Sequence, residues 1–288
     1  MTAATAVDAP VVRAPASSAN LGPGFDVLGM ALDLHADVGL GPPPAGAHPL
    51  GPAHPANAAF TALGGQGAIW LRTSIPMARG LGFSGAVRVA AAGLGAVCAG
   101  GGAAVSAARD EIFRVSAELE GHADNAAASV HGGVVAVIDS TVRSLRVGPR
   151  MSGSAVVAWV PDTTTSTERS RRALPATVER AAAVHNLGRV VQLVLAIERD
   201  DPALLSGATD DRLHQAHRLP HVPGAAEALR QGVEHGAWCG WLSGSGPTVV
   251  LLCAPAVAAD VAGALPPAGH AKQLRIDPQG VRLADRRG

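Results

Sequence analysis

The chain reads PMARGLGFSGA at residues 76–86, and an apolar stretch at residues 84–97 continues from it with alanine, valine and leucine on nearly every face. This composition predicts a buried helix whose N-terminus abuts the glycines. Glycines let a backbone approach a ligand closely, and the free N–H groups of a helix N-terminus bind anions. Ser84 would add a hydroxyl for a phosphate oxygen or a metal. An ordinary turn before a core helix explains the run equally well, so other segments must decide.

The elements around this run mix helices with strands. We expect strands at residues 133–138, 154–160, 238–242 and 248–253, and helices at residues 104–119 and 179–200. In the last helix, apolar positions such as Leu187 and Val191 follow the helical period. Because strands and helices do not alternate regularly, the pattern favours an α+β fold with two lobes over a doubly wound sheet. The boundary at residues 150–153 predicts domains at 1–150 and 151–288.

Charge and composition exclude several classes of partner. The 288 residues include 23 basic and 23 acidic side chains, so no net charge attracts nucleic acid or an anionic membrane. The first 13 residues lack the charged start and apolar stretch of a secretory signal, and no uninterrupted apolar run reaches the length of a membrane span. Three scattered cysteines form no CxxC pair. We therefore expect a cytoplasmic protein that binds a small molecule, with neither nucleic acid nor membrane as partner.

The basic residues are nearly all arginine, and the one lysine is Lys272. A Walker A loop needs a lysine after its glycines, and a protein kinase needs one on a strand. No glycine loop precedes Lys272, so both architectures are disfavoured. Arginine is also the better clamp for a carboxylate or phosphate, because its planar fork donates two parallel hydrogen bonds.

Five further segments gather polar side chains. They are VRAPASSANLGPGFD at residues 12–26, EGHADN at 120–125, TERSRRALP at 167–175, DRLHQAHR at 211–218 and WLSGSGPT at 241–248. Glu120 has the oxygen ligands that magnesium prefers, whereas His122 is either a zinc ligand or a structural histidine. In a helix, Thr167 and Arg171 would be neighbours on one face. Structural turns, a solvated basic patch and a plain hairpin remain the alternatives.

Taken in order, these motifs resemble the galactokinase–homoserine kinase–mevalonate kinase–phosphomevalonate kinase (GHMP) superfamily, and within it the homoserine kinase family. The resemblance runs from about residue 12 to 252 and rests on five motifs in register. It implies an N-terminal ATP-binding lobe, a C-terminal ferredoxin-like lobe and a homodimer. It also implies phosphorylation of the side-chain hydroxyl of L-homoserine to O-phospho-L-homoserine, a step of threonine biosynthesis, with ATP and Mg²⁺.

The same resemblance assigns roles to residues of this chain. It implies ATP binding by Pro76, Arg79, Gly80, Leu81, Gly82, Phe83, Ser84, Gly85, Ala86 and Asn57. It implies magnesium binding by Ser84 and Glu120, which with Thr167 form the catalytic set. It implies substrate binding by Asn20, Asp26, Asn125, Arg171 and Arg218, where Asp26 and Asn125 hold the ammonium group and the two arginines the carboxylate.

The glycine run departs from the family at Phe83, and the helix that follows carries one unusual charge, Arg88. Phe83 stands where relatives have serine, which removes a phosphate-facing hydroxyl, and Arg88 is an unusual charge in an apolar helix. The lack of lysine also leaves no counterpart of the lysine–aspartate pair of mevalonate kinase-like members. A kinase for another small hydroxylated acid, and a non-catalytic relative that binds a ligand, therefore remain alternatives.

Overall fold

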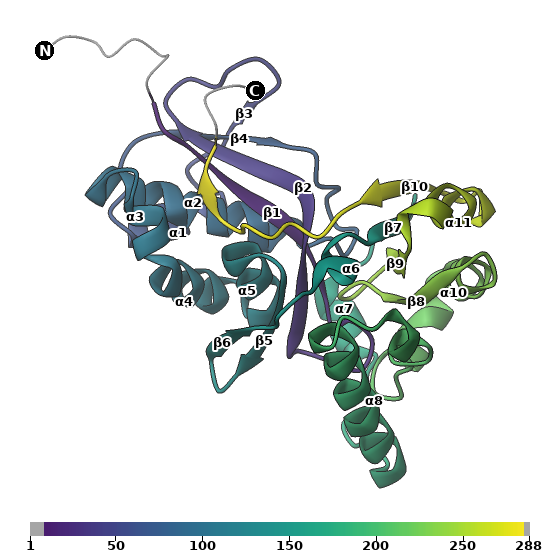
Figure 1. The fold of residues 1–288 in the computed structure, drawn as a ribbon. Coiled ribbons are helices and arrows are strands. Elements are labelled where there is room, and N and C mark those ends of the chain that lie inside the picture. Colours follow the sequence, from purple (N-terminus) through teal and green to yellow (C-terminus); the bar gives the residue numbers. More distant parts are fainter. Residues whose placement is uncertain (1–8, 285–288) are drawn as a thin grey trace, which may run out of the picture.

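The computed structural model describes residues 9–284, and two antiparallel sheets form its framework (Figure 1). Residues 1–8 lie outside the described part. The expectation that the first 13 residues form no secretory signal therefore falls mostly outside the described residues. Helices gather beside the first sheet and around the second, and the chain crosses between the sheets near residue 150 (Figure 1).

The first sheet is built around β2, which is long enough to have two different partners on one edge. Its first half pairs with β5, its second half with β4, and β1 lies along its other edge. The strands are β1 (Val11–Ala19), β2 (Leu28–Leu40), β3 (His48–Pro49), β4 (Ile69–Thr73), β5 (Val134–Ile138), β6 (Thr141–Ser144) and β11 (Arg282–Leu283). The predicted strand at 133–138 is thereby confirmed.

Five helices accompany this sheet: α1 (Pro55–Ala62), α2 (Phe83–Gly100), α3 (Ala104–Ala107), α4 (Arg109–Glu120) and α5 (Ala123–His131). The single helix predicted at residues 104–119 is wrong, because the chain leaves the helical conformation at Ala108. Asp110 and Glu111 then occupy the first turn of α4, where carboxylates favour the start of a helix. Because the composition of residues 104–119 is uniformly favourable to helix, the sequence did not show that a second helix begins at Arg109.

The helix that follows the glycine run is the centre of the first core. Helix α2 packs against β1, β2, α1 and α4, and Ala90, Ala91 and Leu94 on it are completely buried. Among the described helices it is the one long and apolar enough to cross a membrane by length and composition. Its burial inside the protein is that of a core helix, as the composition of residues 84–97 predicts.

The second sheet has the strand order β10-β7-β9-β8, all antiparallel. Its strands are β7 (Ala155–Pro161), β8 (Ala237–Leu242), β9 (Val249–Cys253) and β10 (Gly269–Leu274), and its longer helices are α8 (Arg180–Glu198), α10 (Ala225–Glu234) and α11 (Ala258–Ala264). Strand–helix–strand–strand–helix–strand connectivity with this order is the ferredoxin-like arrangement. The two-lobed α+β prediction is confirmed.

Helix α8 projects from the second lobe (Figure 1). Its buried apolar side chains, such as Leu193 and Ile197, lie near its C-terminal end. The apolar positions that predicted the helix are instead exposed, with Leu187 at 68% and Val191 at 58%. The helical period was therefore correct, but little of the protein covers this side of the helix.

Short helices complete the chain. They are α6 (Pro149–Ser152), α7 (Thr167–Arg172), α9 (Gln215–Arg218) and the 3-10 turns η1 (Pro202–Leu205), η2 (Leu219–His221) and η3 (Pro255–Val257). Helix α6 occupies the boundary expected at 150–153, yet β11 returns to pair with β1 in the first sheet. The division at residue 150 stays a prediction, since the end of the chain contributes to the first sheet.

Candidate active site

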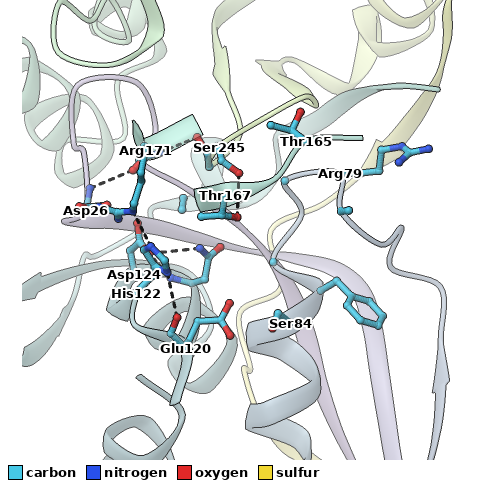
Figure 2. A pocket seen from close by; sticks show the side chains of 18 of the residues that line it. Asp26, Arg79, Ser84, Glu120, His122, Asp124, Thr165, Thr167, Arg171 and Ser245 are labelled. Atoms are coloured by element: carbon cyan, nitrogen blue, oxygen red, sulfur yellow. Dashed lines mark hydrogen bonds and ion pairs between the residues drawn. The ribbon is translucent and has the colours of Figure 1, made fainter. Parts of the chain in front are cut away.

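A pocket of about 290 Å³ opens where the glycine run, the end of β1, the α4–α5 junction, α7 and the β8–β9 turn meet. It collects most of the residues predicted from the motifs: Asn20, Asp26, Arg79, Gly80, Gly82, Phe83, Ser84, Glu120, Asn125, Thr167, Arg171 and Arg218. The other lining residues are Ala19, Phe25, Ala78, His122, Asp124, Thr165, Gly244 and Ser245. Figure 2 shows Ser84 and Glu120 toward one end, and Asp26 and Arg171 toward the other.

Some predicted ATP-binding residues do not line this pocket. Leu81 is buried in the core, and its carbonyl accepts from the Ser17 N–H at 3.2 Å. Asn57 lies in the first turn of α1, where its amide donates to the Gly51 and His54 carbonyls at 2.8 and 3.2 Å. Pro76, Gly85 and Ala86 also lie outside the lining.

Two glycines fix the path of the loop. Gly80 and Gly82 have φ values of +74° and +65°, in the left-handed region that side chains rarely adopt. A Cβ on Gly80 would collide with the carbonyl of Ser243, and one on Gly82 with the hydroxyl of Ser17. The loop therefore lies directly on the β8–β9 turn and on β1, as only glycine permits.

The loop ends at the N-terminus of the 18-residue helix α2. Gly82 is its N-cap and makes no side-chain capping hydrogen bond, so the first N–H groups are left for a ligand. Gly82, Phe83 and Ser84 line the pocket. A helix N-terminus of this kind binds anions through its N–H groups and its dipole.

The turn at residues 243–246 closes over the loop. The Ser243 hydroxyl donates to the Gly80 carbonyl at 2.6 Å. The Asn20 amide donates to the Gly244 carbonyl at 2.9 Å, and its oxygen accepts from the Asp26 N–H at 3.1 Å. Buried Asn20 thus joins the β8–β9 turn to the segment that carries Asp26.

A charged cluster forms the far end of the pocket. Arg171 on α7 donates to the Asp26 carboxylate at 2.6 Å and to Nε2 of His122 at 2.7 Å (Figure 2). Because His122 accepts at Nε2, its proton is on Nδ1, which donates to the Glu120 carbonyl at 3.1 Å. His122 thereby orients an arginine. Among residues 9–284, no three histidine, cysteine or acidic side chains gather as a metal site.

A second arginine lies beside the first. Arg218 is 4% exposed, and Nη1 donates to the Gly244 carbonyl at 3.2 Å. Both Arg171 and Arg218 lie over the ring of Phe25, at 5.6 and 5.3 Å from its centre. Burial and the neighbouring Arg171 lower the pKa of Arg218. Its Nε is buried and finds no hydrogen-bond partner among the described residues, which leaves a donor for an anion.

Asp124 is the most buried acid of the pocket, at 2% exposed. Burial, together with the nearby Asp26 carboxylate, raises its pKa to about 6, against the opposing effect of the Asn125 N–H and Arg171. The sequence places Asp124 in the EGHADN motif, yet its burial could not be inferred from that motif. A cation entering here would favour the ionised carboxylate.

Thr167 lies between the charged cluster and the glycine loop. Its hydroxyl is 3.3 Å from that of Ser245, and the Ser170 hydroxyl donates to the Ser245 carbonyl at 3.3 Å. Helix α7 contains both Thr167 and Arg171, which is the condition under which the sequence makes them neighbours on one face. Thr165 and Ser245 were not predicted. Ser245 belongs to a recognised glycine motif, whereas Thr165 lies in a threonine run without a distinguishing signal.

Ser84 and Glu120 offer a hydroxyl and a carboxylate, the oxygen donors that suit Mg²⁺, and phosphate oxygens would complete such a site. The donor set therefore fits the metal. Both side chains also contact Nη1 of Arg88, one helical turn beyond Ser84. The two predicted magnesium ligands are therefore both in contact with the positively charged guanidinium of Arg88.

Two family models match the chain in sequence order. The GHMP kinases N terminal domain matches residues 52–133, and GHMP kinases C terminal matches residues 193–270. A homoserine kinase of Moorella thermoacetica is 38% identical over 268 residues, or 85% of this chain and 87% of that protein. This chain belongs to the homoserine kinase family. Another homoserine kinase, from Streptomyces coelicolor, is 38% identical over 94% of this chain and 93% of that protein.

Solved structures agree with this homoserine kinase fold. A homoserine kinase of Cytophaga hutchinsonii has a TM-score of 0.83 at 24% identity, over 99% of this chain and all of that one. A mevalonate kinase has a TM-score of 0.69 at 11% identity, over 93% of this chain. The family resemblance inferred from the motifs is confirmed. The chain is a small-molecule kinase and, as such, an ATP-dependent enzyme.

Proposed function

We propose that this enzyme transfers the γ-phosphoryl group of ATP to the side-chain hydroxyl of L-homoserine and forms O-phospho-L-homoserine, a step of threonine biosynthesis. The observation that carries the proposal is the charged cluster of Asp26, Arg171 and Arg218 in the pocket that also receives the N-terminus of α2. An amino acid has one negative and one positive end, and this pocket offers partners for both beside an anion site.

The two arginines hold the substrate carboxylate. Arg171 and Arg218 flank Phe25, and the unpaired Nε of Arg218 would gain an acceptor. Asp26, Asn125 and Asp124 provide the acceptors for the ammonium group. Before the substrate binds, Arg171 and Asp26 satisfy one another at 2.6 Å. A bound zwitterion replaces this pair, because its carboxylate pairs with Arg171 and its ammonium group pairs with Asp26.

The glycine loop binds the phosphates of ATP. Gly82, Phe83 and Ser84 at the start of α2 line the pocket, so the free N–H groups of this helix start are the phosphate donors, with the Ser84 hydroxyl beside them. Arg79 also lines the pocket, and its guanidinium donates to the Asp162 carbonyl at 2.8 Å. Phe83 contributes no hydroxyl here, and its ring packs partly against the core. The backbone donors therefore provide most of the phosphate contact. Asn57, near the start of α1, remains the residue expected at the adenine pocket.

Ser84 and Glu120 would hold Mg²⁺, which when bound neutralises the charge of the phosphates and orients them. The protein itself positions the substrate hydroxyl in line with the γ-phosphate, with Thr167 beside the transferred group. Phosphoryl transfer passes through a loose transition state, so positioning and electrostatics suffice without a strong base. The hydroxyl proton leaves late and goes to the phosphate.

The phosphate loop also supports the alternatives. Phe83 favours a kinase of reduced activity, and the arginine pair admits another small hydroxylated acid as substrate. An ATP-consumption assay with L-homoserine, L-serine, L-threonine and mevalonate distinguishes them, with ³¹P NMR to identify the product. We expect turnover with L-homoserine and a phosphomonoester on the oxygen of its γ-carbon. Turnover with mevalonate alone, or with none of the four, contradicts the proposal.

We further expect a cytoplasmic homodimer that binds neither nucleic acid nor membrane, as the family resemblance and the zero net charge indicate. The molar mass in solution, measured by light scattering, tests the dimer. A mass of twice the 28.8 kDa chain is expected, and the mass of a single chain would contradict it.

A further inference from the structure

The charge of Arg88 has no part in the proposed phosphate contacts, and a buried apolar helix such as α2 does not need a charged side chain to form. It lies on α2, where the residues next to it in the chain, such as Val87 and Val89, are apolar and buried. Its Nη1 contacts both the Ser84 hydroxyl and the Glu120 carboxylate, which come from different helices. These are the two residues that the proposed function assigns to the divalent metal. One guanidinium nitrogen therefore bonds to both proposed metal ligands.

From these contacts we propose that Arg88 is an internal cation that competes with the divalent metal for Ser84 and Glu120 in the nucleotide-free enzyme. The inference rests on the proposed metal site. A metal ion and the Arg88 Nη1 cannot both contact the same carboxylate and hydroxyl oxygens in this arrangement. The guanidinium must withdraw before the two residues can serve a metal.

Charge and burial strengthen the competition. The Arg88 and Glu120 side chains are 15% and 14% exposed, so water screens their attraction only partly. Their charges cancel, and a metal approaching the free enzyme meets a neutral pair. The negative charge of the ATP phosphates would attract the metal, and this attraction would offset the free-energy cost of displacing Arg88 from Glu120. Metal binding thereby becomes dependent on nucleotide.

The guanidinium also has unused hydrogen-bonding capacity. Nε of Arg88 is buried, and nothing in the described part of the chain accepts from it. Because Arg88 lies one helical turn beyond Ser84, a small rotation of its side chain changes which acceptors it reaches. An arginine whose nitrogens are only partly satisfied leaves its partners more readily than one that is fully bonded.

The test measures Mn²⁺ binding to nucleotide-free enzyme through the electron paramagnetic resonance signal of unbound Mn²⁺. Arg88→Met removes the competing cation and leaves Glu120 buried without a partner. We expect this variant to bind Mn²⁺ at least tenfold more tightly than the wild-type enzyme. Adding Glu120→Gln to it should abolish the gain. Equal affinity in wild type and Arg88→Met, or a gain that survives Glu120→Gln, overturns the proposal.

Arg114→Met is the matched control. Arg114 pairs with Glu111 and Glu118 on the exposed face of α4, so its loss also frees two carboxylates and one unit of charge. We expect no gain in Mn²⁺ affinity there, and a gain equal to that of Arg88→Met overturns the proposal. If Arg88→Met does not fold by circular dichroism, Arg88→Gln poses the same question with the same outcomes. Turnover of L-homoserine by the wild type is measured separately, so failure of the proposed function remains distinguishable.

Discussion

Arg171 makes contacts that a neighbouring arginine does not. It reaches Asp26 and His122 inside the pocket, whereas Arg172 pairs with Glu168 on the exposed side of α7. A hydrogen bond to a charged group contributes about 1.5–3 kcal/mol. Arg171→Ala should therefore raise the KM for L-homoserine roughly 10- to 150-fold, with a smaller effect on the KM for ATP. Steady-state kinetics with both substrates varied will measure this.

Arg172→Ala provides the control for that change, because it removes the same charge from the same helix. Its KM for L-homoserine should stay within about twofold of the wild-type value, since exposed pairs contribute little. If both variants behave alike, Arg171 acts through the general charge of α7 and not through contact with the substrate.

Asp124 should make substrate binding depend on pH. Burial raises its pKa to about 6, so the carboxyl is protonated below that pH and ionised above it. The substrate ammonium favours the ionised form, and binding then requires release of the proton. Affinity for L-homoserine should fall up to tenfold per unit as the pH drops below about 6. Isothermal titration calorimetry between pH 5 and 7.5 measures it.

The conservative variant separates this effect from general acid sensitivity. Asp124→Asn carries no titrating proton at this position, so its affinity should be weaker than that of the wild type and nearly flat between pH 5 and 7.5. A wild-type affinity that is equally flat would exclude Asp124 from the ammonium site.

Sequence motifs predicted which single residues meet in the pocket better than they predicted the surroundings of those residues. Asp26, Arg171 and Arg218 were assigned by resemblance, and the structure brings all three to one pocket. The burial of Asp124 and the contact between His122 and Arg171 could not be predicted, because each depends on segments far apart in the chain. The contact between Arg88 and Glu120 was equally hidden, since the two residues lie 32 positions apart.

At the scale of elements, the glycine loop tolerates no added methyl group. An alanine at position 82 would meet the Ser17 hydroxyl and would have to adopt a left-handed φ, a strain of about 1–3 kcal/mol. Ser17 also donates to the Asn125 side chain at 2.9 Å, so the disturbance reaches the substrate site. Gly82→Ala should lower the melting temperature and weaken ATP binding tenfold or more.

Gly188→Ala is the control within a regular helix. On the exposed α8, no described atom lies within 4 Å of the added Cβ. Alanine is favoured over glycine in a helix by about 0.5–1 kcal/mol, so this variant should be unchanged or slightly more stable. Differential scanning fluorimetry compares the two. A Gly82→Ala enzyme as stable and as tight for ATP as the wild type refutes the proposed packing of the loop.

Helices and strands could be predicted where an apolar run in the sequence is also buried in the structure. Helix α2 and strands β5, β7, β8 and β9 follow apolar runs that are buried on several sides. The break at Ala108 was missed because alanine-rich sequence carries no stop signal there. On α8 the period gave the helix correctly, but periodicity does not say whether another part of the protein covers the apolar positions.

At the scale of the whole molecule, the site draws on both lobes. Asn20, Ser84 and Glu120 come from elements of the first, whereas Arg171 and Ser245 come from segments of the second. A ligand that contacts both lobes should therefore raise the stability of the whole protein against unfolding. A non-hydrolysable ATP analogue at one hundred times its dissociation constant should add about 2.7 kcal/mol. At an unfolding entropy of about 2.1 cal/mol/K per residue, this is a rise of roughly 4–5 °C in the melting temperature of the chain.

L-Homoserine should then produce its own shift in the wild-type enzyme and little in Arg171→Ala, with Arg172→Ala behaving as the wild type. Scanning calorimetry reports this. A homoserine shift that does not change with Arg171→Ala would place the substrate elsewhere on the molecule.

The two-lobed architecture could be predicted because several motifs appear in the order of one family. The return of β11 to the first sheet could not, since a two-residue strand carries almost no pattern. The meeting of loop, turn and α7 in one pocket likewise depends on the packing of Gly80 and Gly82 against distant backbone, which no local signal encodes.

The central claim is that this pocket recognises both charged ends of an amino acid while it presents the hydroxyl to ATP. The most direct measurement compares kcat/KM for L-homoserine with that for 3-aminopropan-1-ol, which lacks the carboxylate, in wild type and Arg171→Ala. We predict that the wild type loses at least tenfold with the truncated substrate, whereas Arg171→Ala shows a much smaller difference. Equal losses in the two enzymes would contradict recognition of the carboxylate by Arg171, and with it the proposed site.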